Sequence, residues 1–182
     1  MKVIGVVGLP ASGKGEFSRI AAGMGIPVIV MGDMIRRAVT EAGLEPTDAN
    51  FGMTANRLRA DGGMDAIARL CVPEIRLQKA PLVLVDGIRG DTEVALFKKE
   101  FTGFQLISID SSFEKRLARI AARARSDDFT SPDALRNRDS REIGWGLGKA
   151  LEIADIHVKN EGTLDEFAGT VKKLLGELGQ GT

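Results

Sequence analysis

A chain of 182 residues, of which 43% are hydrophobic, is long enough to form one compact domain around a buried core. Its formal net charge is zero, which excludes a uniformly basic surface of the kind that binds nucleic acid. Its single cysteine, Cys71, excludes an internal disulfide and a four-thiolate zinc site, and it fits a reduced, cytoplasmic setting.

The first half of the chain predicts strands that alternate with helices. The apolar run 3–7 is typical of a strand buried on both faces, and it is too short for a signal peptide. No apolar stretch approaches the roughly 18 residues of a membrane span, so we expect a soluble protein with no membrane partner. A helix is predicted over 13–24, a strand over 27–30, and a second helix from Asp33, as its cap, to Gly43.

The second half continues this alternation after a polar, less regular stretch. Helices are expected around 53–60 and near Leu70, and the clearest strand of the chain is 82–86. The remaining elements are a helix over 93–101, a strand over 104–109, a helix over 113–125, a weak strand over 155–158 and a closing helix over 164–178. The pattern predicts a single α/β domain over 1–182, with a parallel sheet between two layers of helices.

A glycine-rich loop connects the first predicted strand to the first predicted helix. Its residues are Gly8-Leu9-Pro10-Ala11-Ser12-Gly13-Lys14, which have the G-x-x-x-x-G-K pattern. The glycines let backbone N–H groups point at phosphate oxygens, the helix adds the positive end of its dipole, and Lys14 supplies a point charge. We therefore predict that this loop binds the phosphates of ATP, with Mg²⁺ as the accompanying metal ion.

The loop departs from the common pattern directly after its lysine. The Ser or Thr that usually follows, and that binds magnesium, is replaced by Gly15, and Glu16 comes next. Glu16 either holds a magnesium-bound water or points to solvent. Both residues belong to the predicted nucleotide-binding segment, although no hydroxyl is available at position 15.

Three further segments resemble markers of adenylate kinases and follow the same order along the chain. Gly32-Asp33-Met34-Ile35-Arg36 resembles their G-D-M-L-R, and Asp86-Gly87-Ile88-Arg89 resembles their D-G-F-P-R without the proline. Arg119-Ile120-Ala121-Ala122-Arg123 resembles their R-I-x-x-R. The chain therefore resembles an adenylate-kinase-related family of P-loop kinases, whose members are often labelled dephospho-CoA kinase. The resemblance implies a three-layer P-loop NTPase fold, with an acceptor-binding helical insert at about 33–78 and a short lid at about 126–141.

The resemblance also implies how the acceptor is bound. Arg36 and Arg89 would hold the phosphate of the acceptor, with Asp33 beside them. Glu93 stands where adenylate kinases carry a Gln that reads adenine. A carboxylate only accepts hydrogen bonds, so Glu93 suits guanine or the amino group of cytosine better than adenine N1. Alternatively, Glu93 stabilises the start of its helix through the helix dipole.

The same comparison implies roles beside the donor nucleotide. Asp86 would organise magnesium through water, because a carboxylate at the carboxyl end of a buried strand is costly unless it meets a cation. Ligands of open α/β sheets bind at that edge. Arg119 would lie near the adenine of ATP, and Arg123 near its transferring phosphate.

Arginines are concentrated between residues 116 and 141, a range that includes the charged segment 126–139, where we expect a loop or mobile lid. Planar guanidinium groups can stabilise the charge on a phosphoryl group during its transfer. We predict catalytic roles for Lys14, Arg123, Arg138 and Arg141. The alternative is a solvated face of salt bridges, which we expect for Arg125 and Arg136.

The turn Asn160-Glu161-Gly162-Thr163 precedes the closing helix. In related kinases such a turn lies under the donor adenine, which implies that Asn160 and Gly162 contact the nucleotide. Alternatively, the segment is a plain turn with Thr163 as the helix cap.

These observations predict an ATP-dependent phosphotransferase, similar to nucleoside monophosphate kinases, that transfers the terminal phosphate of ATP to a small-molecule nucleotide acceptor. A dephospho-CoA kinase-like enzyme is an alternative, although Arg36 and Arg89 resemble clamps for a monophosphate. A nucleotide-dependent NTPase switch associated with RNA is a second alternative. The absence of tyrosine and the single tryptophan argue against a base-stacking platform, so we do not expect nucleic acid as a partner.

Overall fold

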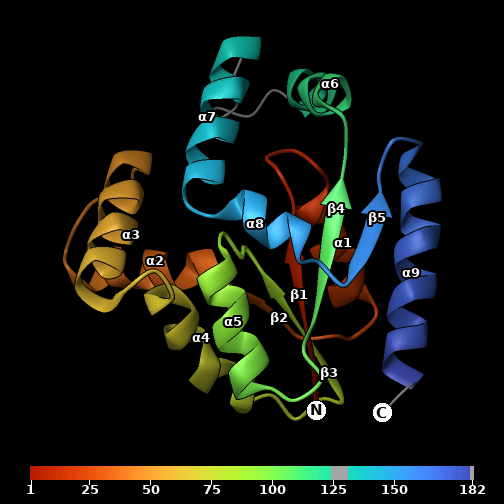
Figure 1. Ribbon diagram of the computed structural model, residues 1–182, viewed down its shortest axis with the longest axis horizontal. Coiled ribbons are helices and arrows are strands. Elements are labelled where there is room, and N and C mark those ends of the chain that lie inside the picture. Colours follow the sequence, from red (N-terminus) through yellow and green to blue (C-terminus); the bar gives the residue numbers. More distant parts are fainter. Residues whose placement is uncertain (124–130, 181–182) are drawn as a thin grey trace.

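The structure, a computed structural model, describes residues 1–123 and 131–180 and is built on a five-stranded parallel sheet (Figure 1). The strand order is β2-β3-β1-β4-β5. The strands are β1 (Lys2–Val7), β2 (Val28–Val30), β3 (Leu82–Asp86), β4 (Gln105–Asp110) and β5 (Ile156–Lys159). This order places β1, which leads into the glycine-rich loop, at the centre of the sheet.

Helices form a layer on each face of the sheet (Figure 1). They are α1 (Lys14–Gly23), α2 (Met31–Glu41), α3 (Asp48–Gly62), α4 (Ala66–Arg76), α5 (Asp91–Glu100), α6 (Phe113–Arg123), α7 (Pro132–Gly144), α8 (Leu147–Glu152) and α9 (Leu164–Gln180). α1 and α9 cover one face, and α4, α5 and α8 pack on the other. α6 and α7 lie beyond the carboxyl ends of the strands (Figure 1). No helix in the described part of the chain is both long and apolar enough to cross a membrane.

The alternation of side chains along each strand divides the core into two parts. On one face, Val83 and Val85 of β3 pack in a cluster with Phe97 of α5. On the other, Leu84 belongs to the cluster that contains Phe17 of α1. Burying one such side chain contributes roughly 1.5–3 kcal/mol, so both helical layers are needed to stabilise a sheet that is apolar on both faces.

The register of the central strands fixes the position of the candidate site. β1 pairs in parallel with β3 on one side and with β4 on the other, and Val6 lies opposite Asp86. The loop after β1 and the end of β3 therefore lie side by side at the carboxyl edge, where ligands of open α/β sheets bind. The predicted α/β fold, with a parallel sheet between helices, is confirmed.

The predicted loop over 126–139 is wrong for the part that the structure describes, because α7 begins at Pro132, whereas the lid at about 126–141 stays a prediction. Ser131 is the N-cap, and its hydroxyl accepts a hydrogen bond from the N–H of Ala134 at 3.2 Å. Proline is favoured at the first position of a helix, so Pro132 begins this helix instead of marking a loop. Residues 126–130 lie outside the described part of the chain.

Two further boundaries differ from the prediction. α2 begins at Met31, directly after β2, and Asp33 lies within its first turn instead of capping it. In that turn the carboxylate still favours the helix dipole. α8 was not expected from the sequence, and it begins after Gly146, whose φ of 102° is left-handed and suits glycine.

Removing the cap of α7 should measurably destabilise the protein. Ser131→Ala deletes the bond to the N–H of Ala134, and we expect the free energy of unfolding in urea to fall by about 1 kcal/mol. Ser140→Ala is the matched control, because Ser140 is exposed in the same helix. That change should be neutral or slightly stabilising, since Ala has the higher helix propensity. Equal effects of the two substitutions would contradict the assigned start of α7.

Candidate functional site

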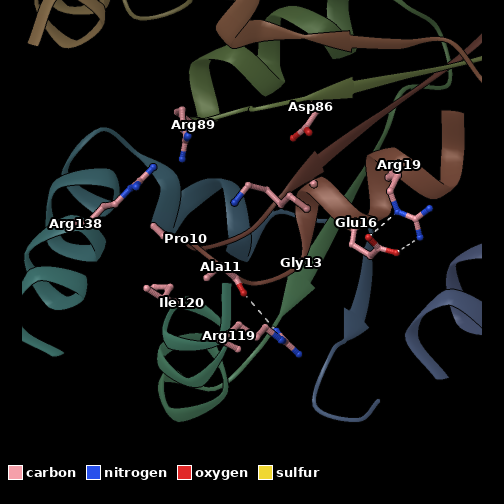
Figure 2. A pocket seen from close by; sticks show the side chains of 13 residues that line it. Pro10, Ala11, Gly13, Glu16, Arg19, Asp86, Arg89, Arg119, Ile120 and Arg138 are labelled. Carbon is pink, nitrogen blue, oxygen red and sulfur yellow. Dashed lines mark hydrogen bonds and ion pairs between the residues drawn. The ribbon is translucent and has the colours of Figure 1, made fainter. Parts of the chain in front are cut away.

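A cavity of about 730 Å³ lies at the carboxyl edge of the sheet, beside the glycine-rich loop (Figure 2). Most residues that were predicted to bind the donor nucleotide line this one space. The lining residues are Pro10, Ala11, Gly13, Lys14, Gly15, Glu16, Arg19, Asp86, Arg89, Arg119, Ile120, Ala122 and Arg138.

Backbone carbonyls of the glycine-rich loop accept hydrogen bonds from side chains of other parts of the fold. Arg116 donates to the carbonyl of Pro10 at 3.1 Å, and Asn160 Nδ2 donates to that of Ser12 at 2.8 Å. In a trans peptide the N–H points opposite to the carbonyl, so the N–H groups that follow these carbonyls point away from those partners. The first N–H groups of α1 have no acceptor within their helix. Such a set of N–H groups forms a concave site for an anion.

Close packing and left-handed backbone explain the small residues in this loop. Gly13 has a φ of 117°, and a Cβ atom there would lie 2.3 Å from Asn160 Nδ2. At Gly8 a Cβ atom would lie 2.5 Å from Ser12 Oγ. Ala11 has a φ of 60°, a conformation that costs a non-glycine residue about 1–2 kcal/mol. Strained backbone of this kind is typical of functional loops.

Lys14 is held by the loop itself. Its Nζ donates to the carbonyl of Gly8 at 2.5 Å and to that of Leu9 at 3.1 Å. Burial, and after it the positive charge of Arg89, lowers the pKa of Lys14 from 10.5 to about 8, while nearby carboxylates oppose the shift. The charge of Lys14 therefore depends on what surrounds it in the cavity.

Asp86 contributes a carboxylate to the cavity wall at the end of β3. Ser18 of α1, which is 9% exposed, donates its hydroxyl to Asp86 Oδ2 at 2.7 Å. Ser18 lies one helical turn after Lys14, so α1 brings a hydroxyl to Asp86 although position 15 has none. The sequence pattern did not indicate Ser18, because it lies outside the loop motif.

Glu16 forms an ion pair with Arg19 on the same helix, and both residues line the cavity. Arg19 donates through two nitrogens, and these hydrogen bonds lower the pKa of Glu16. Glu16 therefore pairs with a cation at the cavity wall, through hydrogen bonds that are exposed to solvent. A contact with magnesium-bound water stays a prediction.

Arg89 and Arg138 point toward one another across the cavity (Figure 2). Arg89 precedes α5, whereas Arg138 lies in α7. Glu142, also in α7 and 2% exposed, accepts hydrogen bonds from both: Arg138 Nε donates to Oε1 at 3.0 Å, and Arg89 donates to Oε2. A carboxylate that joins two cavity arginines was not expected from the sequence.

Two arginines of α6 connect this helix to the glycine-rich loop. Arg119 donates to the carbonyl of Ser12 at 3.2 Å and to that of Asn160 at 2.6 Å. Arg116, which is 3% exposed, is bound in a bidentate pair by Asp139 of α7, at 2.8 and 2.7 Å. Arg119 also lines the cavity, and its contact with adenine stays a prediction.

The turn before α9 supports the loop and caps its own helix. Asn160 is 6% exposed, and its side-chain amide is used by the loop. Glu166 accepts a hydrogen bond from the N–H of Thr163 at 2.8 Å, and Thr163 Oγ1 accepts one from the N–H of Glu166 at 3.2 Å. This capping box favours the plain-turn alternative. Contacts of Asn160 and Gly162 with a nucleotide remain predictions.

Other predicted residues lie away from the cavity. Asp33 and Arg36 pair with each other on an exposed side of α2. Arg141 lies over the ring of Trp145, 5.6 Å from its centroid, and is not among the described residues that line the cavity. The side chain of Arg123 is outside the described part of the chain. The structure therefore does not bring Asp33, Arg36 or Arg141 together with Lys14.

Glu93 is buried at the start of α5, with an exposed fraction of 1%. It accepts a hydrogen bond from the N–H of Arg89 at 2.6 Å, and Arg59 lies 3.6 Å from its Oε1. Burial raises the pKa of Glu93, while the bond from the Arg89 N–H opposes this shift. These contacts favour a role for Glu93 at the start of α5, and not the recognition of a nucleotide base.

Comparison with known proteins agrees with this geometry. A family model described as an AAA domain matches residues 4–144, so the chain is a P-loop protein of that family. A UPF0200 protein from Methanoregula boonei is 63% identical over 175 residues, which cover 96% of each chain. The chain therefore belongs to the UPF0200 family.

Two solved kinases have the same fold. A dephospho-CoA kinase from Campylobacter jejuni is 18% identical, with a TM-score of 0.64 over 100% of this chain and 99% of that chain. A gluconokinase from Sinorhizobium meliloti 1021 is also 18% identical, with a TM-score of 0.60 over 99% of this chain and 94% of that one. At this level of identity the comparison supports the kinase-like fold, and not a particular substrate.

Two glycines of the loop region should respond in opposite ways to a methyl group. Gly13→Ala should lower the free energy of unfolding by about 2 kcal/mol or more, because φ is positive and the new Cβ would overlap Asn160. Gly15→Ala is the matched control, since no atom of the described residues lies within 4 Å of the point that its Cβ would occupy. We expect it to be neutral or to stabilise α1 by up to roughly 1 kcal/mol. Urea unfolding measures both, and equal destabilisation would refute this description of the loop.

Proposed function

We propose that this protein is an ATP-dependent phosphotransferase, similar to nucleoside monophosphate kinases, that transfers the terminal phosphate of ATP to a nucleotide acceptor. One observation carries the proposal. A single cavity is lined by the anion-binding loop with Lys14, by the carboxylate of Asp86, and by guanidinium groups that include Arg89 and Arg138. Phosphoryl transfer between two bound substrates requires such a set of positive groups more than it requires a dedicated base.

Each part of the cavity has a role in this proposal. The N–H groups of the loop and of the first turn of α1 bind the donor phosphates. Lys14 exchanges its bonds to loop carbonyls for bonds to phosphate oxygens. Arg138 neutralises charge on the transferring group from the α7 side, and Arg89 holds the acceptor phosphate from the α5 side. The loop residues do not move a proton in this scheme, because orientation and charge supply the acceleration.

Magnesium fits this site as a partner of the phosphates. Among the described residues there is no group of three or more His, Cys, Asp or Glu side chains that would bind a metal ion by itself. Asp86 offers an oxygen in the cavity wall, the type of ligand that Mg²⁺ prefers, and Ser18 orients that carboxylate. When bound with ATP, magnesium neutralises part of the phosphate charge.

The acceptor of the phosphate is the second substrate of the proposed reaction. Arg89 lines the cavity, whereas Asp33 and Arg36 lie on α2 and pair with each other. A nucleotide acceptor is proposed from the resemblance of these segments to adenylate kinases. The dephospho-CoA kinase that shares the fold supplies the second acceptor class to test.

An acceptor panel tests the proposed reaction. The protein is incubated with MgATP and, separately, with each nucleoside monophosphate and with dephospho-CoA, and the formation of ADP and of the phosphorylated product is followed. At least one acceptor should raise ADP formation well above hydrolysis.

Lys14→Ala should reduce transfer at least 100-fold, an order of magnitude typical of lost transition-state stabilisation. Lys149→Ala, which removes an exposed lysine of α8, is the control. Transfer by Lys14→Ala at the rate of that control would refute the role of the loop.

The lowered pKa of Lys14 predicts proton uptake on nucleotide binding. At pH 9 roughly nine-tenths of the free protein should carry a neutral Lys14, because its pKa is about 8. Bound phosphates favour the charged form and raise that pKa, so binding takes up close to one proton at pH 9 and little at pH 7. Calorimetry of MgATP binding in buffers of different ionisation enthalpy measures the uptake. Lys14→Arg, which stays charged, should show none. Equal uptake at both pH values would contradict the prediction.

A further inference from the structure

We infer that Glu142 is a positioning residue, which holds the guanidinium groups of Arg89 and Arg138 in the orientation that binds phosphate. The inference rests on the proposed function, because it concerns how the cavity binds phosphate, with Arg138 on the side of ATP and Arg89 on the side of the acceptor. Glu142 is not one of the described residues that line the cavity, so it acts through the two arginines that do.

The two oxygens of the Glu142 carboxylate accept hydrogen bonds from arginines of two different segments of the fold. Oε1 accepts from Arg138, one helical turn earlier in α7, and Oε2 accepts from Arg89, which is 53 positions away along the chain. The side chain of Glu142 is 2% exposed, whereas those of Arg89 and Arg138 are 27% and 30% exposed. The carboxylate is therefore buried behind two guanidinium groups that remain accessible from the cavity.

The charges explain why the two arginines need this carboxylate. Arg89, Arg138 and Lys14 are cations around one cavity, and the charges of both arginines lower the pKa of Lys14. Glu142 opposes that effect. Without its negative charge, the two guanidinium groups would lose their shared acceptor and would repel each other and Lys14 more strongly. A buried carboxylate is itself stable only while it is paired, so each partner holds the other in position.

The position of Glu142 is set by α7, and not by its side chain alone. Asp139, three residues earlier, binds Arg116 in a bidentate pair, and Arg116 donates to the loop carbonyl of Pro10. α7 is thus attached both to the phosphate loop and, through Glu142, to the segment before α5. This double attachment keeps the carboxylate between Arg89 and Arg138.

A comparison of two backgrounds tests the inference. MgATP affinity is measured by calorimetry for the wild type and Glu142→Gln, and again for both residues in an Arg89→Ala, Arg138→Ala background. Glu142→Gln should weaken MgATP binding roughly tenfold in the wild-type background, since hydrogen bonds between charged partners are lost. It should cause no weakening where both arginines are absent, because residues that act through one another are not additive.

Asp133→Asn is the matched control for these measurements. Asp133 also lies in α7 and pairs with an arginine, Arg136, but its side chain is 87% exposed. It should leave MgATP affinity unchanged. Circular dichroism and the midpoint of thermal unfolding establish that each variant is folded. If Glu142→Gln does not fold, Glu142→Asp replaces it in both backgrounds. Asp keeps the charge but is shorter by one methylene, so it should weaken binding only where the arginines are present.

Two results would overturn the inference. Equal weakening in both backgrounds would mean that Glu142 supports the fold generally, and tighter binding by Glu142→Gln in the wild-type background would mean that it competes with phosphate. The proposed function fails separately: a wild type that binds MgATP but phosphorylates no acceptor would refute that function and leave this inference standing. Failure of the wild type to bind MgATP would overturn both.

Discussion

The site depends on holding several cations close together at the edge of a parallel sheet. Like charges in a partly buried cavity repel strongly, and each cation must be balanced before any ligand arrives. Lys14 is bound by loop carbonyls, Arg89 and Arg138 share Glu142, and Arg116 is bound by Asp139. These pairs explain why Glu142 is buried and Asp139 is only 13% exposed even though they lie in a strongly charged stretch of sequence.

The balance is possible because the fold brings together segments that are distant along the chain. The glycine-rich loop follows β1, and Asp86 ends the neighbouring strand β3. Helix α6 donates hydrogen bonds to the loop through Arg116 and Arg119. The side chain of Asn160 reaches the carbonyl of Ser12 across 148 positions. The contacts of Arg116 and Asn160 hold two loop carbonyls and so orient the N–H groups that a phosphate would bind. The shape of the loop is therefore a property of the whole carboxyl edge.

The sheet and the loop could be predicted from the sequence, because their signals are local. Apolar runs such as 82–86 indicate buried strands, and the spacing of Gly8, Gly13 and Lys14 reflects a backbone requirement. Ser131 and Pro132 are local signals for the start of α7, but the place of this helix beside the cavity could not be predicted, since its partners Arg116 and Arg89 lie far away along the chain. Arg141 was expected to close over the phosphates, whereas its guanidinium lies over the ring of Trp145, four residues later in the chain.

The replacement at Gly15 shows how a local departure from a motif is balanced within the fold. The hydroxyl that usually follows the lysine is absent, yet Ser18 on the next turn of α1 donates to Asp86. A hydrogen bond to a carboxylate fixes one of its oxygens and leaves the other to face a cation or its water. The carboxylate is thus oriented from α1 at a position that no loop motif would indicate. Ser18 and Glu142 thus have the same relation to the cavity. Each is a polar residue outside the cavity wall that orients charged side chains within it, Ser18 from α1 and Glu142 from α7.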